Sequence, residues 1–275
     1  MMGAHGVSCP MCFGAQSVRV DRVSIMRRVC SRCNGIGRVD FGQALQLYVG
    51  ETQDRRYLEE LKRHKWGRIW TVSRPRTYQG EPWAFDNGAY SDFLKGQPFD
   101  EVRFQKRLDK ATNDLSLMPP QMAVLPDVVA GGMKSARYSL DWLTRLEDHP
   151  WKNWYFAIQD RQTAQEVGCA LSGFPVSAAL SGTVAPGPIH PKVTGIFLGG
   201  SDKFKLTVSY WAGWAHDNGL KFHYGRASTP GRIRAARRSG CDSMDTSFPL
   251  WTRERFEKFI LMWTLKDPQQ ELELQ

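Results

Sequence analysis

The feature that most constrains the fold is a series of eight short apolar or β-branched segments that alternate with longer charged or amphipathic ones. The segments are LQLYV (45–49), RIWTV (68–72), PWAFD (82–86), MAVLPD (122–127), WYFAIQ (154–159), GIFLGG (195–200), KFHYG (221–225) and CDSMD (241–245). Most are separated by stretches long enough for a helix, as at residues 54–64, 100–115 and 135–148. Eight strand–helix units close into a parallel barrel. We therefore predict an α/β fold with a (β/α)8 barrel of the TIM type over residues 43–265, followed by a polar tail at 266–275.

Polar residues stand at the ends of five of the eight predicted strands. In a TIM-type barrel the C-terminal ends of the strands carry the active site. These positions are Asp86, Asp127, Gln159, Gly199 with Gly200, and Asp245. A buried carboxylate is costly unless it is paired or functional, so the pattern predicts one functional face. Taken singly, Asp86 also suits a turn, Asp127 a helix cap, and Gln159 a bond to the backbone.

Four of the six cysteines form two Cys-x-x-Cys motifs, Cys9 with Cys12 and Cys30 with Cys33. Two such motifs can present four thiolates to one tetrahedral zinc ion, and a closed four-sulfur site is structural because it has no open position. Two disulfides are disfavoured in a reducing compartment, and a redox pair lacks the strand–helix context that such pairs have. We predict a zinc-ribbon module over residues 1–42, with structural zinc as its cofactor and a β-hairpin between the motifs.

The charge balance favours a polyanionic partner. The 275 residues include 37 Lys and Arg against 28 Asp and Glu, a net charge of +9, which is typical of proteins that bind nucleic acid. Arg19, Arg22, Arg27 and Arg28 of the predicted hairpin either contact phosphates or form a solvated face. No stretch approaches the roughly 18 apolar residues of a membrane span, and the N-terminus lacks the apolar core of a signal peptide. We therefore expect an intracellular protein.

The order of several motifs resembles a known enzyme superfamily. The series FDNGAY, LPDVV, AIQD, GIFLGG and HYGRASTPGRIRAARRSGCDSMDTSFP is similar to the motif set of the tRNA-guanine transglycosylases over residues 45–250. The compact size and the position of the cysteine motifs look most like the 7-deazaguanine DNA transglycosylases of phages and bacterial DNA-modification islands. The resemblance implies a pentosyltransferase that exchanges guanine in DNA for a free 7-deazaguanine base, in the cytoplasm of a bacterial or phage-infected cell.

The resemblance also implies roles for individual residues. The family pattern GxDxFDxxxP matches residues 240–249, which places the nucleophilic carboxylate on Asp245 and leaves Asp242 as a supporting or structural residue. FDNGAY implies that Asp86 is the general acid and base, although this segment lacks the second glycine of the usual turn. The residues implied to bind the base are Asp127, Gln159, Gly199, Gly200 and His223.

Base exchange explains why such residues are needed. A carboxylate that attacks C1′ holds the sugar as a covalent intermediate while the base is replaced, and a second carboxylate protonates the leaving base and deprotonates the incoming one. The edge of guanine presents N–H donors that a carboxylate and an amide can accept, and glycines let the flat base approach the backbone. A base in a duplex must be flipped out to reach such a pocket.

Two alternatives differ in substrate or in class. The tRNA enzymes carry a zinc site after the last barrel strand, whereas this chain has no cysteine after Cys241, so DNA is the favoured polymer and tRNA the alternative. A non-catalytic zinc-ribbon protein that binds nucleic acid is the third hypothesis, and the three carboxylates argue against it. The segment CSRCNGIGRV also resembles the cysteine-rich module of DnaJ-type co-chaperones over residues 9–39, which we interpret as shared zinc-ribbon geometry.

Overall fold

The computed structural model describes most of the chain after residue 44. The described residues are 45–50, 52, 54–70, 80–114, 116–173 and 187–264, together with four short strands nearer the N-terminus. Of these strands, β1 (Val7–Ser8) pairs antiparallel with β4 (Arg38–Val39), and β2 (Ser17–Arg19) pairs antiparallel with β3 (Arg27–Val29). The β2–β3 pair lies where the hairpin was predicted. The four cysteines of the predicted zinc ribbon lie outside the described residues.

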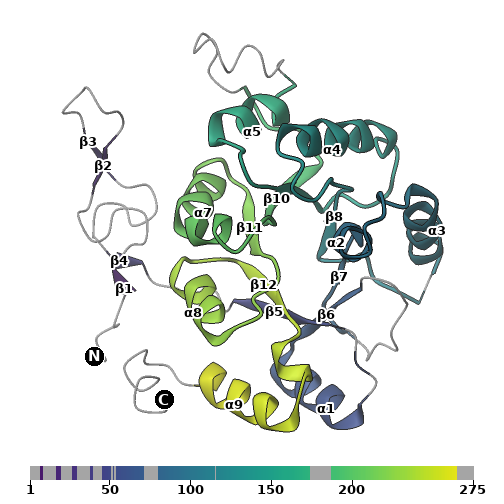
Figure 1. Cartoon of the computed structure of the whole chain (residues 1–275), viewed down its shortest axis with the longest axis vertical. Helices are drawn as coiled ribbons and strands as arrows, with labels where there is room; N and C mark the ends of the chain where they lie inside the picture. The colour runs from purple at the N-terminus through teal and green to yellow at the C-terminus, as the bar shows by residue number, and fades with distance from the viewer. Residues whose placement is uncertain are drawn as a thin grey trace.

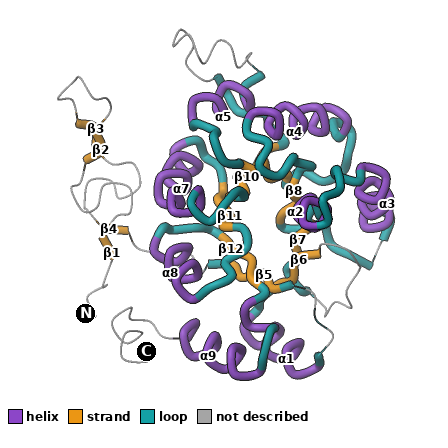
Figure 2. The backbone as a smooth tube through the Cα atoms, viewed as in Figure 1, coloured by secondary structure: helices purple, strands orange, loops and turns teal. Residues whose placement is uncertain are grey.

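Eight parallel strands form a closed barrel. Their bounds are β5 (Gln46–Val49), β6 (Gly67–Trp70), β7 (Trp83–Phe85), β8 (Met122–Val124), β9 (Trp154–Ile158), β10 (Val193–Leu198), β11 (Lys221–Tyr224) and β12 (Ser243–Thr246). Each strand pairs with its neighbours in the sequence, and β12 pairs with β5 to close the ring. Figure 2 shows the ring of strands with helices around it. The predicted TIM-type barrel is therefore confirmed.

Most of the helices form a ring around the outside of the barrel, whereas α2 (Ala89–Leu94) lies within this ring, over the strands (Figure 1). The bounds of the other helices are α1 (Arg55–His64), α3 (Glu101–Thr112), α4 (Met133–Arg145), α5 (Ala164–Leu171), α7 (Val208–Asp217), α8 (Pro230–Arg238) and α9 (Arg253–Thr264), with 3-10 turns η1 (Phe204–Thr207) and η2 (Phe248–Leu250). None of these described helices is both long and apolar enough to cross a bilayer.

The starts of four helices are set by local side-chain caps. Asp54, Asp100, Thr163 and Thr229 each accept a hydrogen bond from a backbone N–H in the first turn of α1, α3, α5 and α8. Such caps satisfy N–H groups that have no partner within the helix. In α8 the proline that follows the cap, Pro230, has the φ that a first helical position needs and no N–H to satisfy. The sequence therefore determines where these helices begin.

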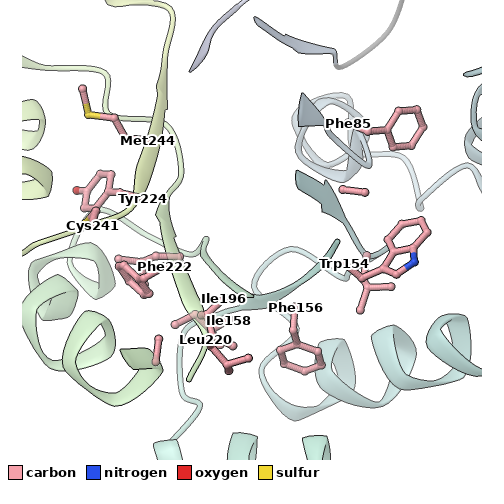
Figure 3. Packing of buried hydrophobic residues seen from close by; sticks show 14 of the residues in the cluster. Phe85, Trp154, Phe156, Ile158, Ile196, Leu220, Phe222, Tyr224, Cys241 and Met244 are labelled. Atoms are coloured by element: carbon pink, nitrogen blue, oxygen red, sulfur yellow. The ribbon is translucent and has the colours of Figure 1, made fainter. Parts of the chain in front are cut away.

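Side chains alternate between the barrel interior and the layer under the helices. Trp154, Phe156 and Ile158 of β9 belong to the large cluster between strands and helices, whereas Tyr155 and Ala157 belong to a small cluster inside the barrel. Figure 3 shows the first kind of packing. The same alternation in β11 and β12 places the polar side chains of three residues on the interior side. These residues are His223, Ser243 and Asp245.

Candidate active site

Six of the residues predicted from strand ends come together around one cavity. The cavity has a volume of about 120 Å³ and lies where the C-terminal ends of the strands meet. Its lining includes Asp86, Asp127, Gln159, Gly199, Gly200 and Asp245. His223, also predicted to bind the base, is fully buried and is not among the lining residues. Its ring lies next to Asp245 and Phe197, which line the cavity, but His223 itself does not line it.

Asp245 lies near the end of β12 and is held by two donors. Its Oδ1 lies 2.9 Å from Nε2 of His223 and accepts a hydrogen bond of 2.9 Å from the backbone N–H of Arg226. Arg226 adopts a left-handed backbone conformation with φ of 55°. This conformation is uncommon for residues other than glycine. It directs the backbone N–H of Arg226 towards the carboxylate of Asp245.

Asp242 has a different environment, although it lies only three residues before Asp245. Its Oδ2 accepts a 2.7 Å hydrogen bond from the backbone N–H of Phe222 and lies 2.7 Å from Nε2 of His216. The residue precedes β12, at the opposite end of the strand from the cavity. Asp242 therefore joins β12 to β11 and to α7, which agrees with the structural role predicted for it.

Asp127 lies in the loop after β8 and is oriented by two amides. Nδ2 of Asn87 donates to its Oδ1 at 2.8 Å and also to the carbonyl of Leu125 at 2.7 Å, and Nε2 of Gln159 donates to its Oδ2. All three polar side chains are buried. Asn87 was not among the residues predicted for the site, although it directly follows Asp86 in the sequence. This network fixes the plane of the Asp127 carboxylate at the wall of the cavity.

Asp86 directly follows β7 and is anchored through its backbone. Its N–H donates to the carbonyl of Trp70 at 3.0 Å, and its own carbonyl accepts from Nη2 of Arg107 at 3.0 Å. The same Nη2 donates to the carbonyl of Trp70. One carboxylate oxygen accepts a 3.3 Å bond from the N–H of Gly88, as in a turn. Asp86 therefore forms a turn through this bond and also lines the cavity.

The glycine pair after β10 is required by close packing. A Cβ on Gly199 would lie 2.8 Å from Nε2 of Gln159, and one on Gly200 would lie 2.6 Å from Oδ2 of Asp160. Gly200 also has φ of 75°, a conformation that favours glycine. Both glycines line the cavity, and neither position has room for a side chain.

The three carboxylates have different pKa shifts. Burial and the negative charge of Asp245 raise the pKa of Asp86 to about 7. Burial raises the pKa of Asp127 to about 6, even though the bonds from Asn87 and Gln159 oppose this. Burial also acts to raise the pKa of Asp245, but the hydrogen bond from His223, the backbone N–H of Arg226 and the charge of Lys205 outweigh it, so the pKa is lowered. One carboxyl is thus prepared to hold a proton and another to stay ionised.

Two cationic residues near Asp245 were not predicted. Arg226 donates from Nη2 to the carbonyl of Gly200 at 2.8 Å, and its guanidinium lies 3.7 Å from the ring centre of Tyr90. Lys205 is buried and donates to the carbonyl of Gly225, and burial and the charge of Arg226 lower its pKa to about 7. Both residues follow strand ends, but the sequence contains many other basic residues in loops, so the signal was not specific.

A larger cavity, of about 580 Å³, lies between α1 and α9. Its charged residues include Arg253, which pairs with Glu257 at 2.8 Å, and Arg63, which lies 3.6 Å from Glu60. The Arg253–Glu257 pair is exposed, whereas the Glu60 side chain is partly buried. None of the residues that line this groove also lines the smaller cavity.

Within the described part of the chain no group of His, Cys, Asp and Glu side chains could hold a metal ion. The side chains of Cys169 and Cys241 are buried. Comparison with protein-family models and with curated proteins finds no match for this sequence. The class that the described residues define is thus a TIM-type barrel with a three-carboxylate cavity at the C-terminal ends of its strands.

Proposed function

We propose that the protein is a DNA base-exchange enzyme that replaces guanine with a 7-deazaguanine derivative through a covalent aspartyl–sugar intermediate. The observation that carries the proposal is the meeting of Asp86, Asp127 and Asp245 around one cavity with pKa values shifted in opposite directions. Two carboxylates whose environments separate their pKa values are the usual arrangement for glycosyl transfer. The identity of the base rests on the motif resemblance.

In the first step the ionised Asp245 attacks C1′ of the target nucleotide. A C1′–O bond forms as the bond from C1′ to N9 of guanine breaks, and the departing base takes the proton of Asp86. In the second step Asp86, now a carboxylate, accepts the N9 proton of the incoming 7-deazaguanine. Its N9 then attacks C1′ and releases Asp245. Atoms and charges balance over the cycle, since each carboxylate ends in its starting state.

Recognition of the base is assigned to Asp127, Gln159 and the backbone at Gly199 and Gly200. Asp127 is held by two amide donors, so its oxygens keep a fixed direction at the cavity wall. Such an acceptor suits the N1 and N2 hydrogens of guanine. The Cβ-free backbone beside it supports the close approach of a flat ring. Arg226 supplies a positive charge at the same wall.

The experiment that tests this proposal asks which polymer gains label. The protein is incubated with labelled guanine or 7-deazaguanine and with single-stranded DNA, duplex DNA or tRNA, and Asp245→Asn serves as the control. We expect incorporation into DNA by the wild-type protein only. Labelling of tRNA alone would support the tRNA alternative, and labelling of no polymer would support the non-catalytic alternative.

The predicted structural zinc ion at Cys9, Cys12, Cys30 and Cys33 takes no part in these steps, since a closed four-sulfur site leaves no position for a substrate. We propose that the module contacts the polymer through its arginines. This part of the proposal rests on the sequence.

A further inference from the structure

The barrel interior directly below the cavity contains an uncommon polar group. His223 of β11 is fully buried, with its ring stacked 4.9 Å from Phe197 and tilted 6.1 Å from Tyr48. Both ring nitrogens have polar neighbours on β12: Nδ1 lies 2.8 Å from Oγ of Ser243, and Nε2 lies 2.9 Å from Oδ1 of Asp245. A buried imidazole between aromatic rings is costly unless its nitrogens are bonded, and here both are.

The two oxygens of Asp245 are therefore unequal. Oδ1 is bonded to Nε2 of His223 and to the backbone N–H of Arg226. No hydrogen bond from the described residues reaches Oδ2, while the Asp245 side chain keeps an exposed fraction of 12%. Hydrogen bonds stabilise the negative charge on the oxygen that accepts them. The lone pairs of Oδ2 are the ones left for a bond to carbon.

We propose that Ser243 and His223 are positioning residues that hold Asp245 ionised and select Oδ2 as its attacking atom. The hydroxyl of Ser243 donates to Nδ1, which keeps the ring proton on Nε2, and Nε2–H then donates to Oδ1. This series of hydrogen bonds requires no contact with substrate, and His223 makes none because its ring is fully buried. The chemical step rests on the proposed function, whereas the effect on Asp245 can be measured without substrate.

Other groups near Asp245 also affect its ionisation, besides the hydrogen bonds from Ser243 through His223. The charge of Lys205 in η1 and the backbone N–H of Arg226 favour its ionised form, and the charge of Asp86, after β7, opposes it. Arg226 is bonded through its backbone N–H, which no side-chain substitution at 226 removes. The donor that substitution can remove is therefore His223, and its loss raises the pKa of Asp245 because the carboxylate loses a hydrogen bond.

The test follows the ionisation of Asp245 by carboxyl ¹³C NMR over pH, with the signal assigned by its loss in Asp245→Asn. In His223→Leu, which keeps the interior apolar, we expect the pKa of Asp245 to rise by at least about one unit. In His223→Gln, which retains a side-chain N–H, most of the wild-type value should return. Ser243→Ala should give a smaller rise and change the ring ¹⁵N shifts of His223, whereas Ser239→Ala, a buried serine bonded to Ser209 on the outside of the barrel, should change neither.

An Asp245 titration that is the same in the wild type, His223→Leu and His223→Gln would overturn the inference. If His223→Leu does not fold, Ser243→Ala decides it, because unchanged ring ¹⁵N shifts of His223 together with an unchanged Asp245 titration in this variant contradict the proposal. With an active wild type, kcat for adduct formation should fall about 10-fold or more in His223→Leu with little change in KM. Absence of any adduct in the wild type would count against the proposed function alone, since the titration is measured without substrate.

Discussion

Nδ2 of Asn87 lies 2.8 Å from Oδ1 of Asp127, and this hydrogen bond joins the loops that follow two neighbouring strands, β7 and β8. The same amide is held by the carbonyl of Leu125, and its oxygen accepts from the N–H of Ala89 at 2.8 Å. Both the nitrogen and the oxygen of the Asn87 side-chain amide are therefore hydrogen-bonded. Asn87 thus links the loop after β7 to the carboxylate in the loop after β8.

Asn87→Ala should weaken base binding more than it slows the chemical step. Asp127 loses one of its two amide donors, which raises its pKa and frees its plane to rotate; losing such a bond costs about 1–3 kcal/mol. We expect KM for the base to rise about 10-fold or more with a smaller change in kcat, measured by steady-state exchange of labelled base. Asp127→Ala should go further and lose the preference for guanine over adenine. An unchanged KM in both variants would remove Asp127 from base recognition.

Asp245→Asn should retain the fold and nucleic-acid binding but lose the covalent adduct, by at least about 1,000-fold in rate, because a neutral amide is a poor nucleophile. Asp242→Asn is the matched control. A neutral amide at position 242 is a weaker acceptor for the N–H of Phe222 and for His216. We therefore expect this variant to have a lower melting temperature and to form the adduct. Denaturing gels of trapped enzyme and thermal unfolding measure the two effects. An adduct that persists in Asp245→Asn and is absent from Asp242→Asn would reverse the two roles.

Adduct formation should slow as pH rises through about 7. Burial and the charge of Asp245 raise the pKa of Asp86 to about 7, and Asp86 must be protonated to donate to the leaving base. The expected profile falls on the alkaline side near this pH, with an acid limb at lower pH where Asp245 takes up a proton. Pre-steady-state adduct yields between pH 5 and pH 9 give the profile. A rate that keeps rising above pH 8 would exclude Asp86 as the acid.

The same shift affects stability. A carboxyl whose folded pKa is raised stabilises the folded state fully below its unfolded pKa, near 4, and loses this contribution as pH rises through the folded value. The wild type should therefore lose stability between about pH 4 and pH 7 relative to Asp86→Asn. Urea unfolding of both proteins over this range measures the difference. A constant difference would show that the pKa of Asp86 is the same in the folded and unfolded states.

Gly200→Ala and Gly219→Ala form a matched pair, because φ is 75° at the first and 71° at the second. Alanine in this conformation costs about 1–2 kcal/mol at either position. At Gly219 nothing lies within 4 Å of the added Cβ, whereas at Gly200 it would meet Oδ2 of Asp160 at 2.6 Å and Cδ1 of Phe204 at 2.8 Å. We expect the greater loss of unfolding free energy, and a loss of activity, only in Gly200→Ala. Equal losses in both would mean that the neighbours of Gly200 relax.

The purified protein should contain one zinc ion per chain. Cys30→Ser should lose most of the metal, because three thiolates remain where four are needed to close the site. Metal analysis of the wild type and of Cys30→Ser measures this, with Cys169→Ser as a control at a buried thiol of the barrel. Equal zinc contents in the wild type and Cys30→Ser would contradict the predicted ligand set.

The sequence by itself determined the barrel. Its eight apolar segments and the long amphipathic stretches between them are local signals, and caps such as Asp54 and Thr163 act within one helical turn. Strand ends converge in any closed parallel barrel, so the gathering of Asp86, Asp127, Gln159 and Asp245 also followed from the sequence order. Because Asp242 and Asp245 are three positions apart, side-chain alternation predicted that the two face opposite sides of a strand.

Only the tertiary structure decided how these side chains are bonded. Asp127 is hydrogen-bonded to Asn87, which lies 40 positions away in the sequence, and to Gln159, which lies 32 positions away. His223, predicted at the pocket wall, lies inside the barrel on Ser243 and Asp245, because the alternation of β11 turns it inward below the cavity. Hydrogen bonds and pKa shifts depend on distances between strands far apart in the chain, which residue order does not encode. The sequence thus placed the carboxylates at one face, and the packing of the barrel lowered the pKa of Asp245 and raised the pKa of Asp86.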